Sequence, residues 1–156
     1  MSKILWIDEI AGKSSKTDRN GKIIRLAFDN HIFFIEKNGH NVTIAASNSE
    51  IVDALNMINQ FDLLILDIIM DPLPFLKQNG YQYGGIDILE YMVNEDKRIP
   101  IIILSVMDPQ KIKDEALRRG LDLDLIGVKK ILRKGSEIPE TIAEIVEIIL
   151  GLSEGE

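Results

Sequence analysis

FDLLILDIIMDP, residues Phe61 to Pro72, is the stretch of sequence that decides the fold. Its apolar run is long enough for one strand and shows no polar alternation before Asp67, which is typical of a strand covered on both faces in a parallel α/β sheet. Ligands of such sheets gather at the carboxyl ends of the strands. Asp67 is therefore predicted to lie at the mouth of a site, although a lone carboxylate there could equally cap a turn.

Strand and helix patterns alternate on both sides of this stretch. Other apolar runs predict strands at 3–7, 41–46, 101–104 and 128–132. Amphipathic spacing predicts helices at 23–37, 51–58, 86–93, 109–120 and 139–150. Five such alternations predict an α/β fold: a five-stranded parallel sheet with right-handed crossovers, doubly wound as (βα)5 in the flavodoxin-like order 2-1-3-4-5. The segment 121–126 is interpreted as an inserted connection.

Length and composition narrow the class of protein. The 156 residues predict a single domain over 1–156, with its core at 3–150 and a frayed tail at 151–156, where Gly151 is expected to follow the end of the last helix. A net charge of −7, from 18 basic and 25 acidic residues, disfavours direct binding to nucleic acid or to an anionic membrane. There are no cysteines, no signal peptide pattern and no membrane-spanning run, so we expect a cytoplasmic protein.

Acidic residues end two of the predicted strands. Asp8 and Glu9 follow the first strand as Asp67 follows the third, and in the order 2-1-3-4-5 these strands are neighbours about 4.8 Å apart. Three carboxylates at one place repel one another, and a hard divalent cation such as Mg²⁺ would relieve that repulsion. Ser105 and Lys134, at the ends of the fourth and fifth strands, would add a hydroxyl donor and a positive charge. These are parts suited to holding a phosphoryl group.

With these residues in place, the chain resembles the receiver domain of bacterial and archaeal two-component response regulators over about residues 3–150. The resemblance is carried by the acidic pair in ILWIDE, the aspartate in LLILDIIMDP, Gly85 before the third helix, the hydroxyl in IIILSV and the lysine in ILRKG. It implies that Asp67 accepts a phosphoryl group from a sensor histidine kinase, a phosphotransfer protein or a small donor. Such a domain catalyses only its own phosphorylation and dephosphorylation.

The resemblance also implies a role for each remaining site residue. Asp8 and Glu9 would hold Mg²⁺ together with Asp67 and the backbone carbonyl of Ile69. Ser105 would move toward the phosphoryl oxygens, and Lys134 would pair with them. The output would be contact with a downstream protein, or a homodimer, through the fourth and fifth predicted helices.

Several positions depart from the family pattern. Gly135 follows Lys134 where a proline is usual, and Lys130 is a rival for the role of the site lysine. Ile131 stands at the position of the family's switch aromatic, so a hydroxyl-only switch, or none, is expected. The loops 10–22 and 68–84 are longer than the family's ordinary loops and are expected to overhang the site.

Two other functions remain open from the sequence. The first is a pseudo-receiver, an interaction module with the same fold that is not controlled by phosphorylation. The second and more remote is a nucleotide hydrolase, because Gly12-Lys13-Ser14 follows the first strand and LLILD resembles a Walker B strand. A P-loop, however, needs a glycine where Ile7 stands and a helix directly after the serine.

Overall fold

Strands and helices alternate through the computed structural model, which describes residues 2–8, 30–70, 83–136 and 139–154. Residues 30–37 are helical. The other elements, in chain order, are β1 (Lys3–Ile7), β2 (Asn41–Ala45), α2 (Asn48–Asn56), the short 3₁₀ helix η2 (Ile58–Gln60), β3 (Leu63–Leu66), α3 (Gly84–Asn94), β4 (Ile101–Ser105), α4 (Pro109–Arg118), α5 (Leu123–Ile126), β5 (Val128–Arg133) and α6 (Pro139–Glu154).

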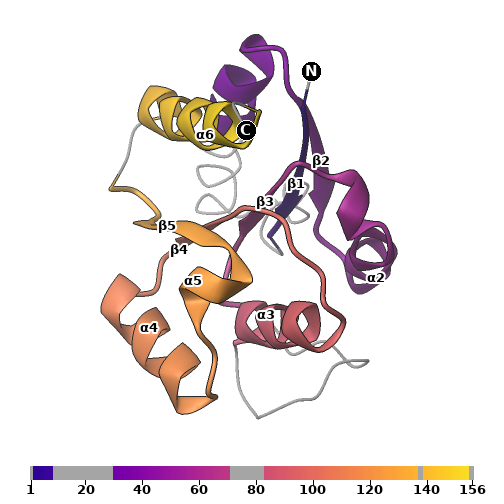
Figure 1. The fold of residues 1–156 in the computed structure, drawn as a ribbon. Coiled ribbons are helices and arrows are strands. Elements are labelled where there is room, and N and C mark those ends of the chain that lie inside the picture. Colours follow the sequence, from indigo (N-terminus) through magenta and orange to yellow (C-terminus); the bar gives the residue numbers. More distant parts are fainter. Residues whose placement is uncertain (1, 9–29, 71–82, 137–138, 155–156) are drawn as a thin grey trace, which may run out of the picture.

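The five strands form one parallel sheet in the order β2-β1-β3-β4-β5, which confirms the topology predicted from the sequence (Figure 1). β1 lies between β2 and β3, and its last residue, Ile7, is opposite both Ala45 and Leu66. β3 and β4 are buried along their whole length because helices cover both faces of the sheet. This explains why their sequences are apolar without alternation.

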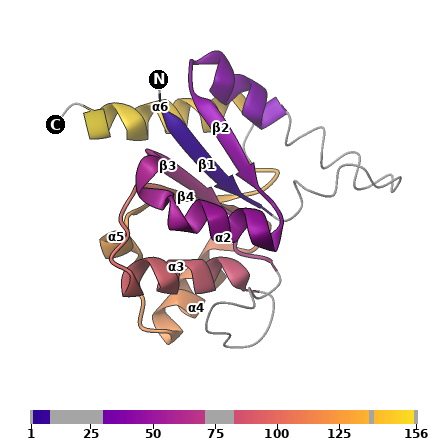
Figure 2. The ribbon, with the colours of Figure 1, turned by 90° about the vertical axis from the view of Figure 1, so that its right-hand side faces the viewer.

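Two hydrophobic layers hold the helices to the sheet. On one face, the helix at 30–37 and α6 pack over side chains such as Trp6 and Ile65. On the other face, α2, α3, α4 and α5 pack over the alternate strand residues, among them Leu64 and Ile103 (Figures 1 and 2). The strand ends, which carry the polar residues of the predicted site, are thereby fixed from both sides.

Two segments differ from the sequence prediction. Residues 123–126, interpreted from the sequence as part of an inserted connection, form the short helix α5. The Asp122 side chain accepts hydrogen bonds from the backbone of Asp124 and Leu125, and Gly127 ends the helix at φ 114°. The prediction that the last helix ends before Gly151 is wrong: α6 continues to Glu154.

An ion cluster joins α3 to α4, and we call it the Arg119 clasp. The Arg119 guanidinium, whose side chain is 4% exposed, lies 2.6 Å from Asp87 of α3, 3.2 Å from Glu90 of α3 and 3.2 Å from Glu115 of α4. Burial raises the pKa of Asp87, and Arg119 offsets part of that effect. The clasp therefore stabilises a charge that would be costly to bury without a cation.

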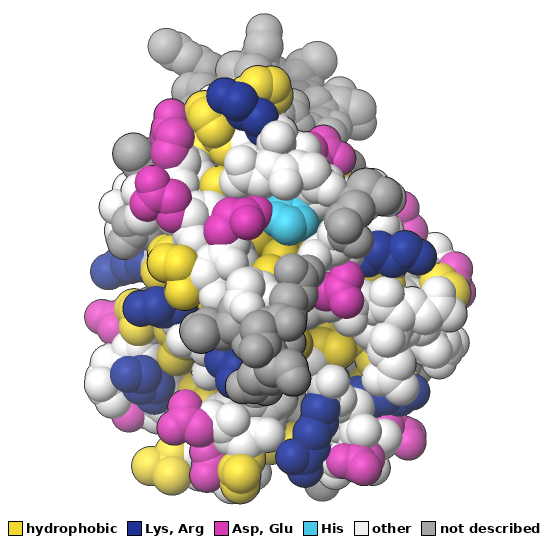
Figure 3. Space-filling view, turned by 45° about the horizontal axis from the view of Figure 1, so that its top comes forward, with side chains coloured by type: hydrophobic (Ala, Val, Ile, Leu, Met, Phe, Trp, Pro, Cys, Tyr) yellow, Lys and Arg dark blue, Asp and Glu magenta, His cyan; other side chains and the backbone are white. Residues whose placement is uncertain are grey.

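The outer surface mixes charged and apolar side chains. On the face shown in Figure 3, acidic, basic and hydrophobic groups are interspersed without a broad field of one sign. Within the part of the chain that the structure describes, no helix is both long and apolar enough to cross a bilayer.

Candidate functional site

Asp8 and Asp67 meet at the carboxyl end of the sheet. Each follows directly after its strand, β1 or β3, and the backbone N–H of Asp67 donates to the Ile7 carbonyl at 3.0 Å. Both aspartates are only 1% exposed. The parallel pairing of β1 with β3 therefore brings together the two carboxylates that the sequence placed at neighbouring strand ends.

Ser105 and Lys134 reach the same edge from the next two strands. Ser105 is the last residue of β4 and is fully buried, and its carbonyl accepts a hydrogen bond from the backbone N–H of Lys134 at 2.8 Å. The Lys134 ammonium lies 2.8 Å from Asp8 Oδ2 and 3.0 Å from Asp67 Oδ2. One cation thus bridges two buried carboxylates.

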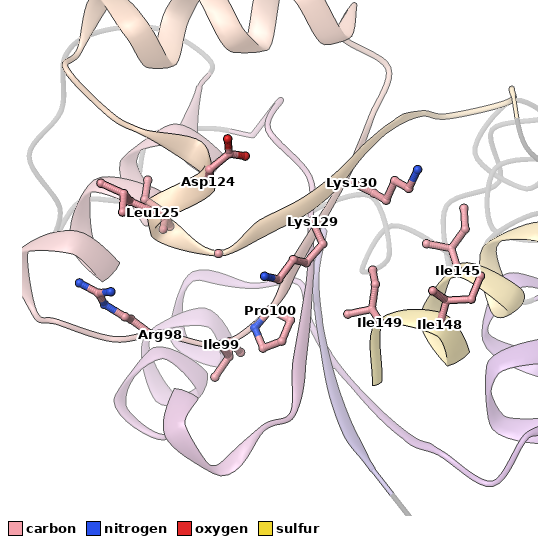
Figure 4. A pocket seen from close by; sticks show the side chains of 12 residues that line it. Arg98, Ile99, Pro100, Asp124, Leu125, Lys129, Lys130, Ile145, Ile148 and Ile149 are labelled. Atoms are coloured by element: carbon pink, nitrogen blue, oxygen red, sulfur yellow. The ribbon is translucent and has the colours of Figure 1, made fainter. Parts of the chain in front are cut away.

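The structure separates the two lysines that the sequence left as rivals. Lys130 lies within β5, is exposed, and lines a groove beside α5 and α6 (Figure 4). Lys134 is one residue beyond the strand, where its side chain turns toward the aspartates. The lysine of this site is Lys134.

Among the described residues, the site holds two buried carboxylates, those of Asp8 and Asp67, and the ammonium of Lys134. Burial raises the pKa of Asp67; Lys134 counters this, while the negative charge of Asp8 reinforces it. Burial disfavours the charged form of Lys134, but Asp8 and Asp67 outweigh that cost and raise its pKa above the ordinary value. Among the described side chains, two carboxylates face one ammonium, an arrangement that would favour the binding of a cation.

The start of α3 packs against the segment that follows β3. The backbone N–H of Gly84 donates to the Met70 carbonyl, and that of Gly85 donates to the Ile68 carbonyl, both at 3.1 Å. A Cβ atom at Gly85 would come within 2.2 Å of the Asp67 carbonyl oxygen. Only glycine fits there, which gives a physical reason for the glycine noted in the sequence before this helix.

Backbone turns orient the aspartate and serine side chains. The N–H of Ile69 donates to Asp67 Oδ1 at 3.2 Å, and the N–H of Met107 donates to Ser105 Oγ at 3.3 Å. The Ile69 carbonyl lies between the Ile68 and Met70 carbonyls, which contact α3, and takes no part in those contacts. The ligand role of the Ile69 carbonyl stays a prediction.

The donor set fits a hard divalent cation. The buried carboxylates of Asp8 and Asp67 are oxygen ligands of the kind that Mg²⁺ prefers, and Mg²⁺ commonly needs only one or two carboxylates plus water. Glu9, the third expected carboxylate, lies outside the described residues. Within the described residues no group of three or more acidic or histidine side chains forms a metal cluster.

Comparison with solved structures finds the same fold over nearly the whole chain. The receiver domain of a Francisella response regulator matches with a TM-score of 0.60 and 24% identity, covering 98% of this chain and 99% of that one. A receiver domain from Methanospirillum hungatei matches with a TM-score of 0.62 and 17% identity, covering 99% and 98%. The chain has the fold of a response regulator receiver domain. A receiver domain from Clostridium thermocellum gives a similar match, with a TM-score of 0.59 and 19% identity over 99% and 98% of the two chains.

At these identities the likeness to receiver domains is one of fold. No family model matches the sequence, and no curated protein matches it. The function must therefore be inferred from the strand order and from the positions of Asp8, Asp67, Ser105 and Lys134 at one edge of the sheet.

A histidine also lies near this cluster of side chains. His31 is half-buried, and its ring lies 6.3 Å from the Trp6 ring. Burial lowers its pKa, and the charge of Lys134 lowers it further. The sequence placed His31 on a predicted helix, but it did not show that this helix packs against Trp6 of β1.

Some predictions concern parts of the chain outside the described residues. These are the loop 10–22, residues 71–82 of the second long loop, and the Gly12-Lys13-Ser14 stretch that suggested a nucleotide site. They stay predictions.

Proposed function

We propose that the chain is a phosphoacceptor receiver domain of a two-component phosphorelay, in which Mg²⁺-dependent phosphorylation of Asp67 switches a protein–protein contact. The observation that supports this most directly is the Lys134 ammonium held between the buried carboxylates of Asp8 and Asp67. The receiver fold makes a role in two-component signalling the natural context for such a site.

Asp67 supplies the nucleophile in this proposal. One of its carboxylate oxygens attacks phosphorus and forms a new P–O bond while the bond from phosphorus to the leaving group breaks. The leaving group keeps the electron pair and departs as acetate from acetyl phosphate, or as the imidazole of a phosphohistidine on a sensor kinase or phosphotransfer protein. An ionised carboxylate needs no general base for this step.

Other residues hold the transferred group. The Lys134 ammonium, already 3.0 Å from Asp67, pairs with a phosphoryl oxygen, and the Ser105 hydroxyl donates a hydrogen bond to another. Asp8, Asp67, the Ile69 carbonyl and Glu9 are the proposed ligands of Mg²⁺. The ion would supply positive charge that offsets the charge of the phosphoryl group.

The output is proposed to be a shift between two conformations. A phosphoryl group on Asp67 favours the state in which the Ser105 hydroxyl reaches it, and β4 carries that change toward α4. Ile131 offers no aromatic ring that could swing inward, so the switch acts through the hydroxyl. The domain acts on no substrate other than itself, and its partners are a phosphodonor protein and a downstream protein in the cytoplasm.

Incubation with acetyl phosphate and Mg²⁺ should add the mass of one phosphoryl group to the intact protein. Asp67→Asn should abolish the adduct, because an amide is not a nucleophile toward phosphorus. Asp53→Asn, on the exposed face of α2, is the matched control and should keep it. Intact-protein mass spectrometry reads all three. If the wild-type protein gained no mass, phosphorylation of Asp67 would be excluded and the pseudo-receiver would be the better hypothesis.

Titration with Mg²⁺ should change the fluorescence of Trp6, which is buried in β1 two residues before Asp8. EDTA should restore the starting signal. Asp67→Asn should weaken the apparent affinity by about tenfold or more, since it removes one of the charged ligands. Mg²⁺ binding would be excluded from the proposal if the Trp6 fluorescence did not change and if magnetic resonance or calorimetry also detected no binding.

A further inference from the structure

A half-buried histidine lies beside the site and has no part in the proposed phosphoryl transfer. His31 is on the helix at 30–37, which together with α6 covers one face of the sheet (Figure 1). Its ring lies 6.3 Å from the Trp6 ring, at a tilt of 44°. Trp6 is the residue before the last in β1 and precedes Asp8 by two positions, so His31 packs near the end of the sheet that carries the site.

The buried side chains under this helix continue directly into the charged side chains of the site. Three strands each place a residue in this hydrophobic layer two positions before a site residue: Trp6 before Asp8, Ile65 before Asp67 and Leu132 before Lys134. Side chains two residues apart on a strand lie on the same side of the sheet. The helix that carries His31 therefore covers the side on which the three charges gather.

The imidazole of His31 is polar but is not held by a hydrogen bond at its inner nitrogen. Its Nδ1 atom is buried and has no hydrogen-bond partner among the residues that the structure describes. Burial lowers the pKa of His31, and the positive charge of Lys134 lowers it further. Near neutral pH the ring is therefore uncharged while Lys134 lies between the two aspartates.

Charged side chains reach the helix at 30–37 from α6 and from the turn after β5. Lys134, in that turn, is the charge that acts on His31. Three carboxylates of α6 line a groove beside Phe34, one turn further along the helix: Glu140, Glu144 and Glu147. On the helix itself Glu36 and Lys37 are exposed, and β1 and β2 face it with uncharged side chains. A change in the charge around Lys134 is therefore the change that His31 would detect.

We propose that His31 is a proton-binding residue coupled to the site: it is uncharged while Lys134 lies between Asp8 and Asp67, and it takes up a proton from water when a phosphoryl group on Asp67 binds Lys134. An aspartyl phosphate carries more negative charge than the aspartate from which it forms, so it reduces the repulsion between Lys134 and a protonated His31. The part of this inference that involves a phosphoryl group rests on the proposed function. The coupling between Lys134 and His31 does not.

The coupling has a definite direction with pH. The phosphorylated protein should bind the proton at a higher pH than the unmodified protein does. Because coupling between two sites is reciprocal, a proton on His31 should favour the phosphorylated state by the same factor. Acidification through the range in which His31 titrates should therefore stabilise the phosphorylated state.

Nuclear magnetic resonance of the imidazole rings between about pH 5 and pH 8 tests the coupling without a phosphodonor. The chain has two histidines, and His31→Gln identifies which signal belongs to which. Lys134→Met should raise the titration midpoint of His31, because it removes a positive charge, and Asp67→Asn should lower it, because it removes a negative one. Each shift should be about half a pH unit or more.

Two matched controls make the same charge changes at exposed positions. Lys130→Met lies in β5, and Asp53→Asn lies in α2. Both should move the midpoint of His31 by less than about 0.2 pH unit, because water and salt screen exposed charges. If His31 titrates alike in the wild-type protein, the two site variants and the controls, the inference is overturned.

Beryllofluoride, which mimics a phosphoryl group on an aspartate, tests the second part. With Mg²⁺ present throughout, it should raise the midpoint of His31 by about half a pH unit or more. His40 is the internal reference: it precedes β2 at the opposite end of the sheet, pairs with Glu147 and should not move. Relative to His31→Gln, the wild-type protein should gain about twofold or more in beryllofluoride affinity between about pH 8 and pH 5.5.

The outcomes separate this inference from the proposed function. A phosphoryl adduct on Asp67 with no shift of His31 beyond that of His40 would overturn the inference and leave the function standing. Shifts of His31 in both site variants, with no adduct from acetyl phosphate, would support the coupling of His31 to Lys134 and overturn the proposed phosphorylation.

Discussion

Replacing Lys134 by methionine should lower the free energy of unfolding by about 4 kcal/mol. Lys134 is the cation that lies between Asp8 and Asp67, which are each 1% exposed. Its removal leaves two buried negative charges facing each other without that cation, and removal of one partner from a buried ion pair is strongly destabilising. Urea unfolding followed by circular dichroism measures the loss. Mg²⁺ should restore part of it, since an ion that binds only the folded state stabilises that state.

Lys130→Met is the control for this prediction. Lys130 carries the same charge four residues earlier, but it is exposed and pairs with no residue in the described part of the chain. Its replacement should change the stability by no more than about 0.5 kcal/mol. Equal losses from the two lysines, or a loss below about 1 kcal/mol for Lys134→Met, would contradict a structural role for Lys134 between the two aspartates.

Gly85→Ala should destabilise the fold by about 3 kcal/mol, the upper part of the range for overpacking a dense interior. The added Cβ would lie 2.2 Å from the Asp67 carbonyl oxygen and 2.6 Å from the Ile68 Cα, and both are backbone atoms of the segment that follows β3. α3 must shift to relieve this contact, so we also expect slower modification of Asp67 by acetyl phosphate. Urea unfolding and the mass-spectrometric assay measure the two effects.

Gly151→Ala provides a control with the opposite sign. Gly151 lies within α6, and an added Cβ meets no atom within 4 Å. Alanine in an open helical position should stabilise the protein by about 0.5–1 kcal/mol. If Gly85→Ala were as harmless as Gly151→Ala, the close approach of α3 to the acceptor strand would not exist in solution.

The sequence predicted the sheet order and the strand ends of the site because both depend on short local patterns. The apolar runs around Leu5, Leu64 and Ile103 mark fully buried strands, and the polar residue after each run marks the edge where the strands end. Asp8, Asp67 and Ser105 could therefore be placed on one edge from these patterns alone.

Other features depend on contacts that no local pattern reveals. Lys130 and Lys134 both lie near the end of the chain's last strand, and the choice between them depends on where β5 ends, which is at Arg133. Arg119 is 32 residues from Asp87, and the pairing follows from the placement of α4 beside α3. Gly151 suggested a helix end, but the preceding turns of α6 pack on the sheet and the helix continues.

The Arg119 clasp is expected to couple the movements of α3 and α4. Separation of α4 from α3 would leave the buried carboxylate of Asp87 without its cation. The two helices are therefore expected to move together and not to slide past each other. Gly85, at the start of α3, lies against the backbone of Asp67 and Ile68, so a change in the position of that backbone is expected to move α3 together with α4.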